Sequence, residues 1–222
     1  MTSGLWKLVL EGIWVTVQLL FLSALLAGAM SFLAGIARTS RRWAVRFLAG
    51  LYTEVFRGTS ALIMIFWVYF VLPLALGWQL VPLWAGTLAL GLTYGAYGSE
   101  IVRGALNAVD PAQREGGIAL GFTPWQRMRL ILLPQAVPEM IPPFSNLLVE
   151  LLKGTALVSV MGMGDLTFSA TLVRLALQQS VEVYTYVLLI YFAIAFLLTR
   201  LMRGLEKRLK AGVGGTTTGG AS

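Results

Sequence analysis

The chain has 222 residues, of which 57% are apolar and only 12% charged. A soluble globule of this length needs more polar surface than this composition supplies, so a membrane protein is predicted. The absence of cysteine and histidine excludes disulfides and thiolate metal sites and removes the commonest general base. No P-loop motif for ATP phosphates and no HExxH zinc motif occurs. We therefore expect no catalytic, cofactor or metal site on this chain.

Five helical spans are predicted, because about 20 apolar helical residues cross the core of a bilayer. The first apolar run is too long for a cleaved signal, so we expect it to be retained. Clustered helix-breaking residues divide the uncharged stretch 58–99 into two crossings. The predicted spans are residues 12–37, 58–76, 82–103, 142–161 and 183–202. The predicted fold is an all-α polytopic membrane protein, with one transmembrane domain over 1–210 and a disordered Gly/Thr-rich tail over 211–222.

The basic residues predict which side of the membrane each loop faces. All but three of the 17 Lys and Arg residues lie in the segments 38–57, 103–129 and 200–210. Cytoplasmic loops carry an excess of Lys and Arg, so these segments are expected in the cytoplasm, with the amino terminus outside and the carboxyl terminus inside. The net charge of +7 is then a topology signal. No nucleic-acid partner is expected, because the cations are divided among loops without a soluble basic domain.

The third span contains two predicted packing features. Glycines at spacings of four and three, from Gly91 to Gly98, are expected to form notches for a closely packed helix. Near the cytoplasmic end of the span, Glu100 is expected to pair with Arg103. Arg57, at the start of the second span, is expected to be an interfacial anchor that extends its charge to water.

A polar segment at 107–134, between the third and fourth spans, is predicted to form two short cytoplasmic helices. An Asp-Pro pair at 110–111 and a Thr-Pro pair at 123–124 are each typical of a helix start. Gly121 is expected to end the first helix, and Pro134 the second. Two interpretations stay open on the residues alone. The segment is either a unit that a partner protein grips, or an amphipathic loop whose arginines meet lipid phosphates on the inner leaflet.

Four residues of this segment, from Glu115 to Pro134, follow the spacing E-x5-G-x9-I-x2-P. This spacing resembles the coupling loop of bacterial ABC importer permeases, in which two alanines usually follow the glutamate. Here Gly116 and Gly117 replace them, and each helical glycine costs about 1 kcal/mol relative to alanine, so a looser unit is expected. The resemblance implies a type I ABC importer permease fold. The implied ATPase-coupling residues are Arg114, Glu115, Gly116, Gly117, Gly121, Trp125 and Pro134.

Two further segments narrow the resemblance to the polar amino acid permeases. Residues 96–104, AYGSEIVRG, are similar to that family's AYxAExxRG stretch, and residues 54–59, EVFRGT, are similar to the segment that opens its second span. Residues 57–67 and the coupling loop also resemble permeases for ectoine and hydroxyectoine, which are zwitterionic compatible solutes.

The resemblance implies an assembly in a bacterial cell membrane. Its implied partners are a dimer of ATPase subunits that bind ATP and Mg²⁺, a second permease subunit, identical or different, an extracytoplasmic solute-binding protein and membrane lipid. The chain would form half of the path for a polar amino acid or a similar zwitterion such as ectoine. The alternative function is a passive membrane channel or a scaffold with an amphipathic inner loop, which would tolerate charge reversal at Glu115.

The translocation path is predicted from polar groups that lipid should exclude. Glu150 and Lys153 in the fourth span are expected to pair and to face the protein interior, as a zwitterion site or as an ion pair at a subunit seam. The hydroxyls at 59–60 either line the path or satisfy backbone carbonyls, and two tyrosines of the third span either shape a pocket or lie in the interfacial belt. The candidate path residues are Thr59, Ser60, Tyr94, Tyr97, Asn146, Glu150 and Lys153.

Overall fold

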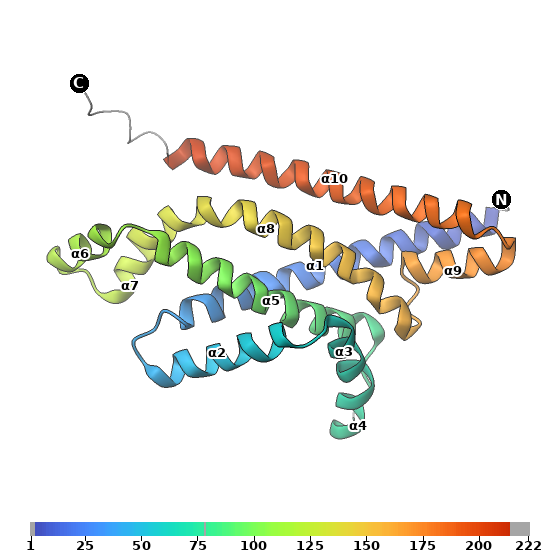
Figure 1. Cartoon of the computed structure of the whole chain (residues 1–222), viewed down its shortest axis with the longest axis horizontal. Helices are drawn as coiled ribbons and strands as arrows, with labels where there is room; N and C mark the ends of the chain where they lie inside the picture. Colours follow the sequence, from blue (N-terminus) through green and yellow to red (C-terminus); the bar gives the residue numbers. More distant parts are fainter. Residues whose placement is uncertain (1–2, 78, 214–222) are drawn as a thin grey trace.

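The computed structural model describes residues 3–77 and 79–213, and all the regular secondary structure in this part of the chain is helical. Figure 1 shows the long helices running side by side, with α6 and α7 at one end and the amino terminus with α9 at the other. The helices are α1 (Ser3–Ala37), α2 (Trp43–Gly58), α3 (Ala61–Phe66), α4 (Leu72–Leu76), α5 (Pro82–Ala108), α6 (Pro111–Ala119), α7 (Pro124–Arg127), α8 (Leu133–Thr155), α9 (Leu166–Leu177) and α10 (Ser180–Val213). Short π-helical turns join α3 to α4 and α7 to α8, and a short 3-10 helix follows α8.

Three helices of the described part are long and apolar enough to cross a membrane: Gly4–Ala37, Pro124–Met161 and Ser180–Leu209. A fourth crossing is possible if α2 and the helix from Ala61 to Leu76, which meet at a bend of 105°, count as one broken span. α5 is 27 residues long but is less apolar, because it is rich in Gly, Thr and Tyr. It packs against α1, α2, α3 and α8, and the hydroxyls of Thr87, Thr93 and Ser99 are buried inside the bundle.

The predicted bounds of three segments are wrong. The second helical unit begins at Trp43, within the predicted loop, because α2 is an amphipathic helix of 16 residues that extends to Gly58. The fourth span begins near Pro124 rather than at residue 142, and it includes Pro134, which was predicted to end a helix. α10 continues to Val213, so part of the predicted tail is helical, and the remainder, residues 214–222, lies outside the described residues.

Pro73 and Pro134 each lie in a continuous helical segment directly after a wider, π-helical turn, whereas Pro138, Pro142 and Pro143 lie inside α8 without such a turn. The N–H of Leu133 bonds to the carbonyl of Met128, five residues back, directly before Pro134. Leu72 bonds in the same way to Trp67, directly before Pro73. A proline in a regular α-helix clashes with the carbonyl four residues back, and the wider turn relieves this clash. Pro134 therefore does not end its helix, contrary to the prediction.

The glycine notches predicted in the third span are confirmed, and α1 packs into them. A Cβ at Gly91 would lie 2.6 Å from Leu26 Cδ2, and one at Gly95 would lie 2.7 Å from Met30 Cβ. Ser31 of α1 also lies within hydrogen-bond distance of the carbonyl of Gly95, at 3.3 Å. This close approach of α1 and α5 forms the centre of the bundle.

Asp165 caps the amino terminus of α9 from a fully buried position. Its carboxylate accepts hydrogen bonds from the backbone N–H groups of Thr167, at 3.0 Å, and Phe168, at 3.4 Å. The first N–H of α9, that of Leu166, donates to Thr16 Oγ1 of α1 at 3.0 Å. Burial raises the pKa of Asp165 to about 6, although the backbone hydrogen bonds oppose the rise.

Asp165→Asn should change how stability depends on pH. The pKa of Asp165 rises from 3.8 to about 6 on folding, so the folded state keeps a proton that the unfolded chain loses in this window. Stability is therefore lost as the pH rises from about 4 to about 6, by about 3 kcal/mol in all. The asparagine amide does not ionise, and its one oxygen can accept only one of the two cap bonds, because these bonds reach different oxygens of the carboxylate. Above about pH 6 the variant should be the more stable protein, and the difference should shrink toward about pH 4. Thermal unfolding in detergent measures both proteins, and a difference that does not change with pH would contradict the prediction.

Candidate coupling surface and translocation face

The two-helix unit predicted between the third and fourth spans is present at one end of the molecule (Figure 1). Asp110 caps α6, because its carboxylate accepts a hydrogen bond from the N–H of Ala112 at 2.9 Å. α7 begins with a reciprocal capping box. The Thr123 hydroxyl accepts from the N–H of Gln126 at 3.3 Å, and the Gln126 side chain accepts from the N–H of Thr123 at 2.8 Å. Both predicted helix starts are thus confirmed.

Gly121 ends α6, as predicted, in a left-handed conformation with φ of 74°. The N–H of Phe122 bonds to the carbonyl of Gly117 at 3.0 Å, and the N–H of Gly121 bonds to that of Ile118 at 2.9 Å. This pair of bonds is the Schellman arrangement, which satisfies the last carbonyls of a helix and favours glycine at this position. The turn between α6 and α7 is therefore defined by hydrogen bonds, even though two glycines lie within α6.

The exposed side chains of α6 and α7 form a surface of mixed character. Ile118 is 53% exposed and Trp125 65% exposed, beside the exposed Arg114 and Glu115. Among the described residues Glu115 forms no ion pair. We call these four residues the coupling surface. Tryptophan and arginine side chains are enriched at the centres of protein interfaces.

Gly116→Ala and Gly117→Ala should differ although they are neighbours. A Cβ at Gly116 meets nothing within 4 Å, whereas one at Gly117 would lie 2.8 Å from Ile131 Cδ1 and 2.9 Å from Arg127 Cγ. Alanine at position 116 should therefore stabilise α6 by about 1 kcal/mol. At position 117 the displaced side chains should offset that gain. Hydrogen exchange of the α6 amides measures the effect, and equal protection in both variants would contradict it.

Three helices meet at the carboxylate of Glu100. Arg103 donates to Glu100 Oε2 from Nε at 2.9 Å and from Nη2 at 2.6 Å, which confirms the predicted pair. Arg38, at the end of α1, also bonds to Glu100, and Arg57, at the end of α2, lies with Nη1 at 3.6 Å from Oε1. The guanidinium of Arg57, which the sequence predicts to be an interfacial anchor, also lies over the ring of Tyr97, 5.6 Å from the ring centre.

The tyrosines of the predicted path connect three helices. Tyr94 donates from its hydroxyl to the backbone carbonyl of Glu150 on α8 at 3.0 Å, and Tyr97 donates to the carbonyl of Arg57 on α2 at 3.3 Å. Their ring centres are 6.2 Å apart. The structure therefore brings the two tyrosines, Arg57 and Glu150 into one neighbourhood, although they come from distant parts of the chain.

The hydroxyls at the bend between α2 and α3 differ in their contacts. Thr59 donates to the carbonyl of Val55 at 2.8 Å, which is the backbone-satisfying role considered for it. Ser60 is exposed at the start of α3, and its side chain makes no cap hydrogen bond there.

Asn146, Glu150 and Lys153 follow one another along one exposed face of α8. Within the described residues Glu150 and Lys153 form no ion pair, so the predicted pairing is wrong. They also face away from the interior of this chain. The sequence spacing was sufficient to place them on one face of a helix, but the neighbours of that face depend on tertiary packing.

Comparisons with known proteins agree with this architecture. The model of the family "binding-protein-dependent transport system inner membrane component" matches residues 5–211. The chain is a member of this family. The permease is thus the membrane component of an ABC importer, and ATP is hydrolysed by a separate subunit. Membership of this family implies ATPase and binding-protein partners in general, as the sequence predicts.

Individual relatives match almost the whole permease. It is 47% identical to the probable amino-acid ABC transporter permease protein y4tF of Sinorhizobium fredii, with 88% of this chain and 84% of that protein covered. It is 34% identical to the arginine transport system permease protein ArtQ of Bacillus subtilis, with 91% of this chain and 93% of that protein covered. It is 33% identical to the glutamine transport system permease protein GlnP of Escherichia coli, with 94% of this chain and 97% of that protein covered.

Solved structures show the same fold. A chain of an amino acid ABC transporter crystallised with histidines is 31% identical and superposes with a TM-score of 0.83, with 91% of this chain and 94% of that chain covered. A chain of the inward facing MetNI methionine ABC transporter is 19% identical with a TM-score of 0.81, with 94% and 99% covered, and shows the fold alone. The permease therefore has the type I ABC importer permease fold.

Proposed function

We propose that the permease carries a polar amino acid across the membrane, driven by an ATPase dimer that grips the coupling surface. The observation that carries the proposal is the two-helix unit, which is capped at both helix starts and leaves Glu115 and Trp125 exposed at one end of the bundle. The relatives named for amino acid, arginine and glutamine transport support the substrate class. Family membership argues against the passive channel or scaffold, neither of which needs an ATPase.

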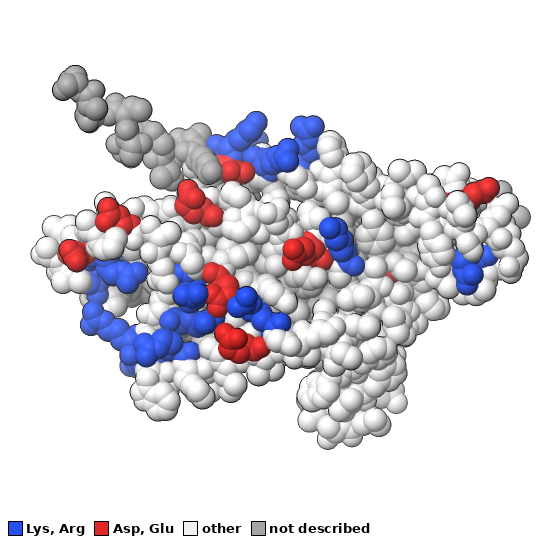
Figure 2. Space-filling view, viewed as in Figure 1, with Lys and Arg blue, Asp and Glu red and all other residues white. Residues whose placement is uncertain are grey.

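We further propose that the end of the molecule with α6 and α7 faces the cytoplasm. Figure 2 shows most of the basic side chains gathered toward that end, on the elements around α6, α7 and the later part of α10. Cytoplasmic loops are enriched in Lys and Arg, which supports this orientation. The amino terminus and α9 then face outward, where a solute-binding protein would dock.

The exposed polar face of α8 supports a second permease subunit. Glu150 and Lys153 would cost several kcal/mol in lipid without a partner, so a protein or a water-filled path must cover them. We propose that a second permease, identical or different, packs against this side of α8. Asn146, Glu150 and Lys153 would then line the seam with Tyr94, Tyr97, Thr59 and Ser60 nearby, where the separated charges suit the two charges of an amino acid.

Reconstitution tests this function. The permease and its ATPase subunits are placed in proteoliposomes, and labelled arginine, glutamine, histidine and ectoine are each supplied with the solute-binding protein. We expect ATP-dependent accumulation of at least one of the amino acids. Accumulation of ectoine alone would contradict the amino acid assignment and support the compatible-solute resemblance. Equilibration without ATP would instead support a passive channel.

A further inference from the structure

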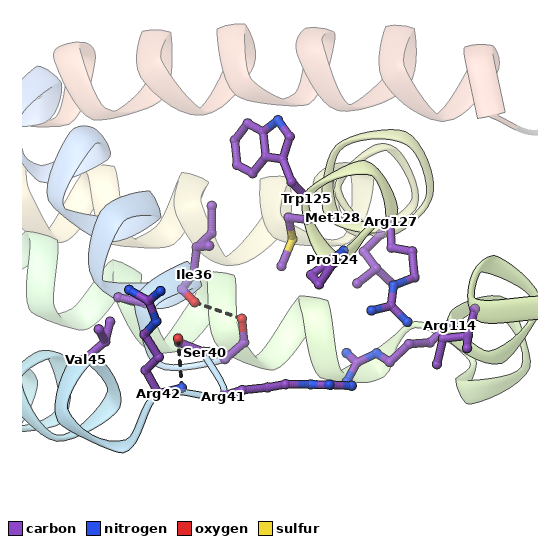
Figure 3. Close-up of a pocket in the computed structure, with 14 residues that line it drawn as sticks. Ile36, Ser40, Arg41, Arg42, Val45, Arg114, Pro124, Trp125, Arg127 and Met128 are labelled. Carbon is purple, nitrogen blue, oxygen red and sulfur yellow. Dashed lines mark hydrogen bonds between the residues drawn. The ribbon is translucent and has the colours of Figure 1, made fainter. Parts of the chain in front are cut away.

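The geometry points to a binding site for the phosphate headgroup of an anionic phospholipid, in the pocket between the α1–α2 loop and the start of α7. The cavity has a volume of about 670 Å³. Its wall includes four arginines, and the floor is apolar. Figure 3 shows that they come from two sides, with Arg41 and Arg42 on the α1–α2 loop, Arg114 on α6 and Arg127 on α7. We call this cavity the arginine pocket. Three residues of the coupling surface, Arg114, Ile118 and Trp125, also line it, so the pocket adjoins the surface proposed for the ATPase.

The arginines of the pocket form no ion pair with the residues that the structure describes. By contrast, Arg38, Arg57 and Arg103 share Glu100 nearby. In Figure 3 the guanidinium ends of Arg41, Arg114 and Arg127 converge on the same side of the pocket. Like charges held together repel, and a bound anion removes that repulsion.

A phosphate suits the arginine pocket better than a single carboxylate, because several guanidinium groups approach one place in the pocket. Each guanidinium presents a planar fork of N–H donors that matches phosphate oxygens. A headgroup phosphate in reach of three such forks could take charge-assisted hydrogen bonds from different segments. Binding would therefore join the α1–α2 loop to the α6–α7 unit, which are separate in the sequence.

The surroundings favour a lipid over an acidic protein surface. Ile36, near the end of α1, lines the pocket, so the pocket lies at one end of a helix that is long and apolar enough to cross a membrane. α2 begins beside it and exposes Trp43, at 72%, and Phe47, at 59%. Trp125 stands at the pocket with 65% of its surface exposed. Tryptophan is enriched at membrane interfaces, and basic pockets between helices there bind anionic headgroups, with acyl chains along apolar surfaces.

Native mass spectrometry of the complete complex with its ATPase subunits tests this site. The complex is titrated with phosphatidylglycerol and, separately, with phosphatidylcholine of the same acyl chains. We expect phosphatidylglycerol to be retained selectively. Arg41→Gln combined with Arg127→Gln should weaken its binding by about 25-fold, which is about fivefold for each arginine. The matched control is Arg200→Gln combined with Arg203→Gln, which removes two charges from α10 and should change binding by less than about twofold.

Three outcomes would overturn the site. They are equal binding of the two lipids, equal losses in the two double variants, and a pocket variant that loses its ATPase subunits while it keeps its lipid. The last outcome would assign the arginine pocket to the ATPase. A photoreactive phosphatidylglycerol headgroup gives a test on the unaltered protein if the pocket variant unfolds. We expect label on the peptide that contains Trp125, and label confined to other peptides would also overturn the proposal.

Discussion

Glu115→Lys should reduce ATP-driven uptake by about 30-fold while the permease still inserts and folds. Glu115 is exposed on α6 and forms no ion pair with the residues that the structure describes, so the substitution removes no internal contact. At an interface, reversing a charge replaces attraction with repulsion and costs about 2 kcal/mol or more, which corresponds to a loss of coupled uptake of about 30-fold. Uptake into proteoliposomes and co-purification of the ATPase subunits measure the effect.

The matched control for this prediction is Glu182→Lys. Glu182 is exposed at the start of α10, at the opposite end of the molecule from α6 (Figure 1). The same change of charge there should leave co-purification of the ATPase unchanged. If Glu115→Lys retains both uptake and the ATPase subunits, α6 is not the coupling element, and the amphipathic-loop interpretation is favoured.

Glu100→Gln should destabilise the permease more than any other single loss of charge considered above. Glu100 is 21% exposed and pairs with Arg38, which is 17% exposed, and with Arg57 and Arg103. Glutamine keeps the size of the side chain but leaves three guanidinium groups close together without a carboxylate. Removing one partner of a fully buried pair costs several kcal/mol, and solvent screening reduces this to about 2 kcal/mol here. The midpoint of thermal unfolding should fall by about 6 °C.

Glu54→Gln is the control for Glu100→Gln. Glu54 is exposed on α2 and has no ion pair among the described residues. The midpoint of thermal unfolding of the Glu54→Gln variant should therefore differ from that of the unaltered protein by less than about 1 °C. Scanning calorimetry or intrinsic tryptophan fluorescence in the same detergent compares the two variants. Equal midpoints would mean that the Glu100 cluster contributes no net stability.

The features predicted correctly from sequence depend on short-range interactions. The Asp110 cap reaches only to residue 112, and the Thr123 capping box only to residue 126. The Glu100–Arg103 pair likewise lies within one helical turn. Such interactions follow from residue types and spacing, because the backbone of a helix sets the geometry.

The features that were missed depend on long-range packing or on backbone adjustment. Arg38 reaches Glu100 across 62 positions in the sequence, and no spacing rule predicts this contact. The stop predicted at Pro134 fails because a π-helical turn absorbs the proline. The spacing of Glu150 and Lys153 predicts a shared face but not which neighbour covers it, so their pairing was predicted wrongly.

Site-specific cross-linking tests the central claim most directly, because the natural chain contains no cysteine. A single cysteine is introduced as Glu115→Cys in the assembled transporter, and Gln179→Cys, in the exposed turn between α9 and α10, serves as the control. We predict that Glu115→Cys cross-links to the ATPase subunit and that Gln179→Cys does not. Cross-linking of Glu115→Cys to the solute-binding protein, or of Gln179→Cys to the ATPase, would contradict the account.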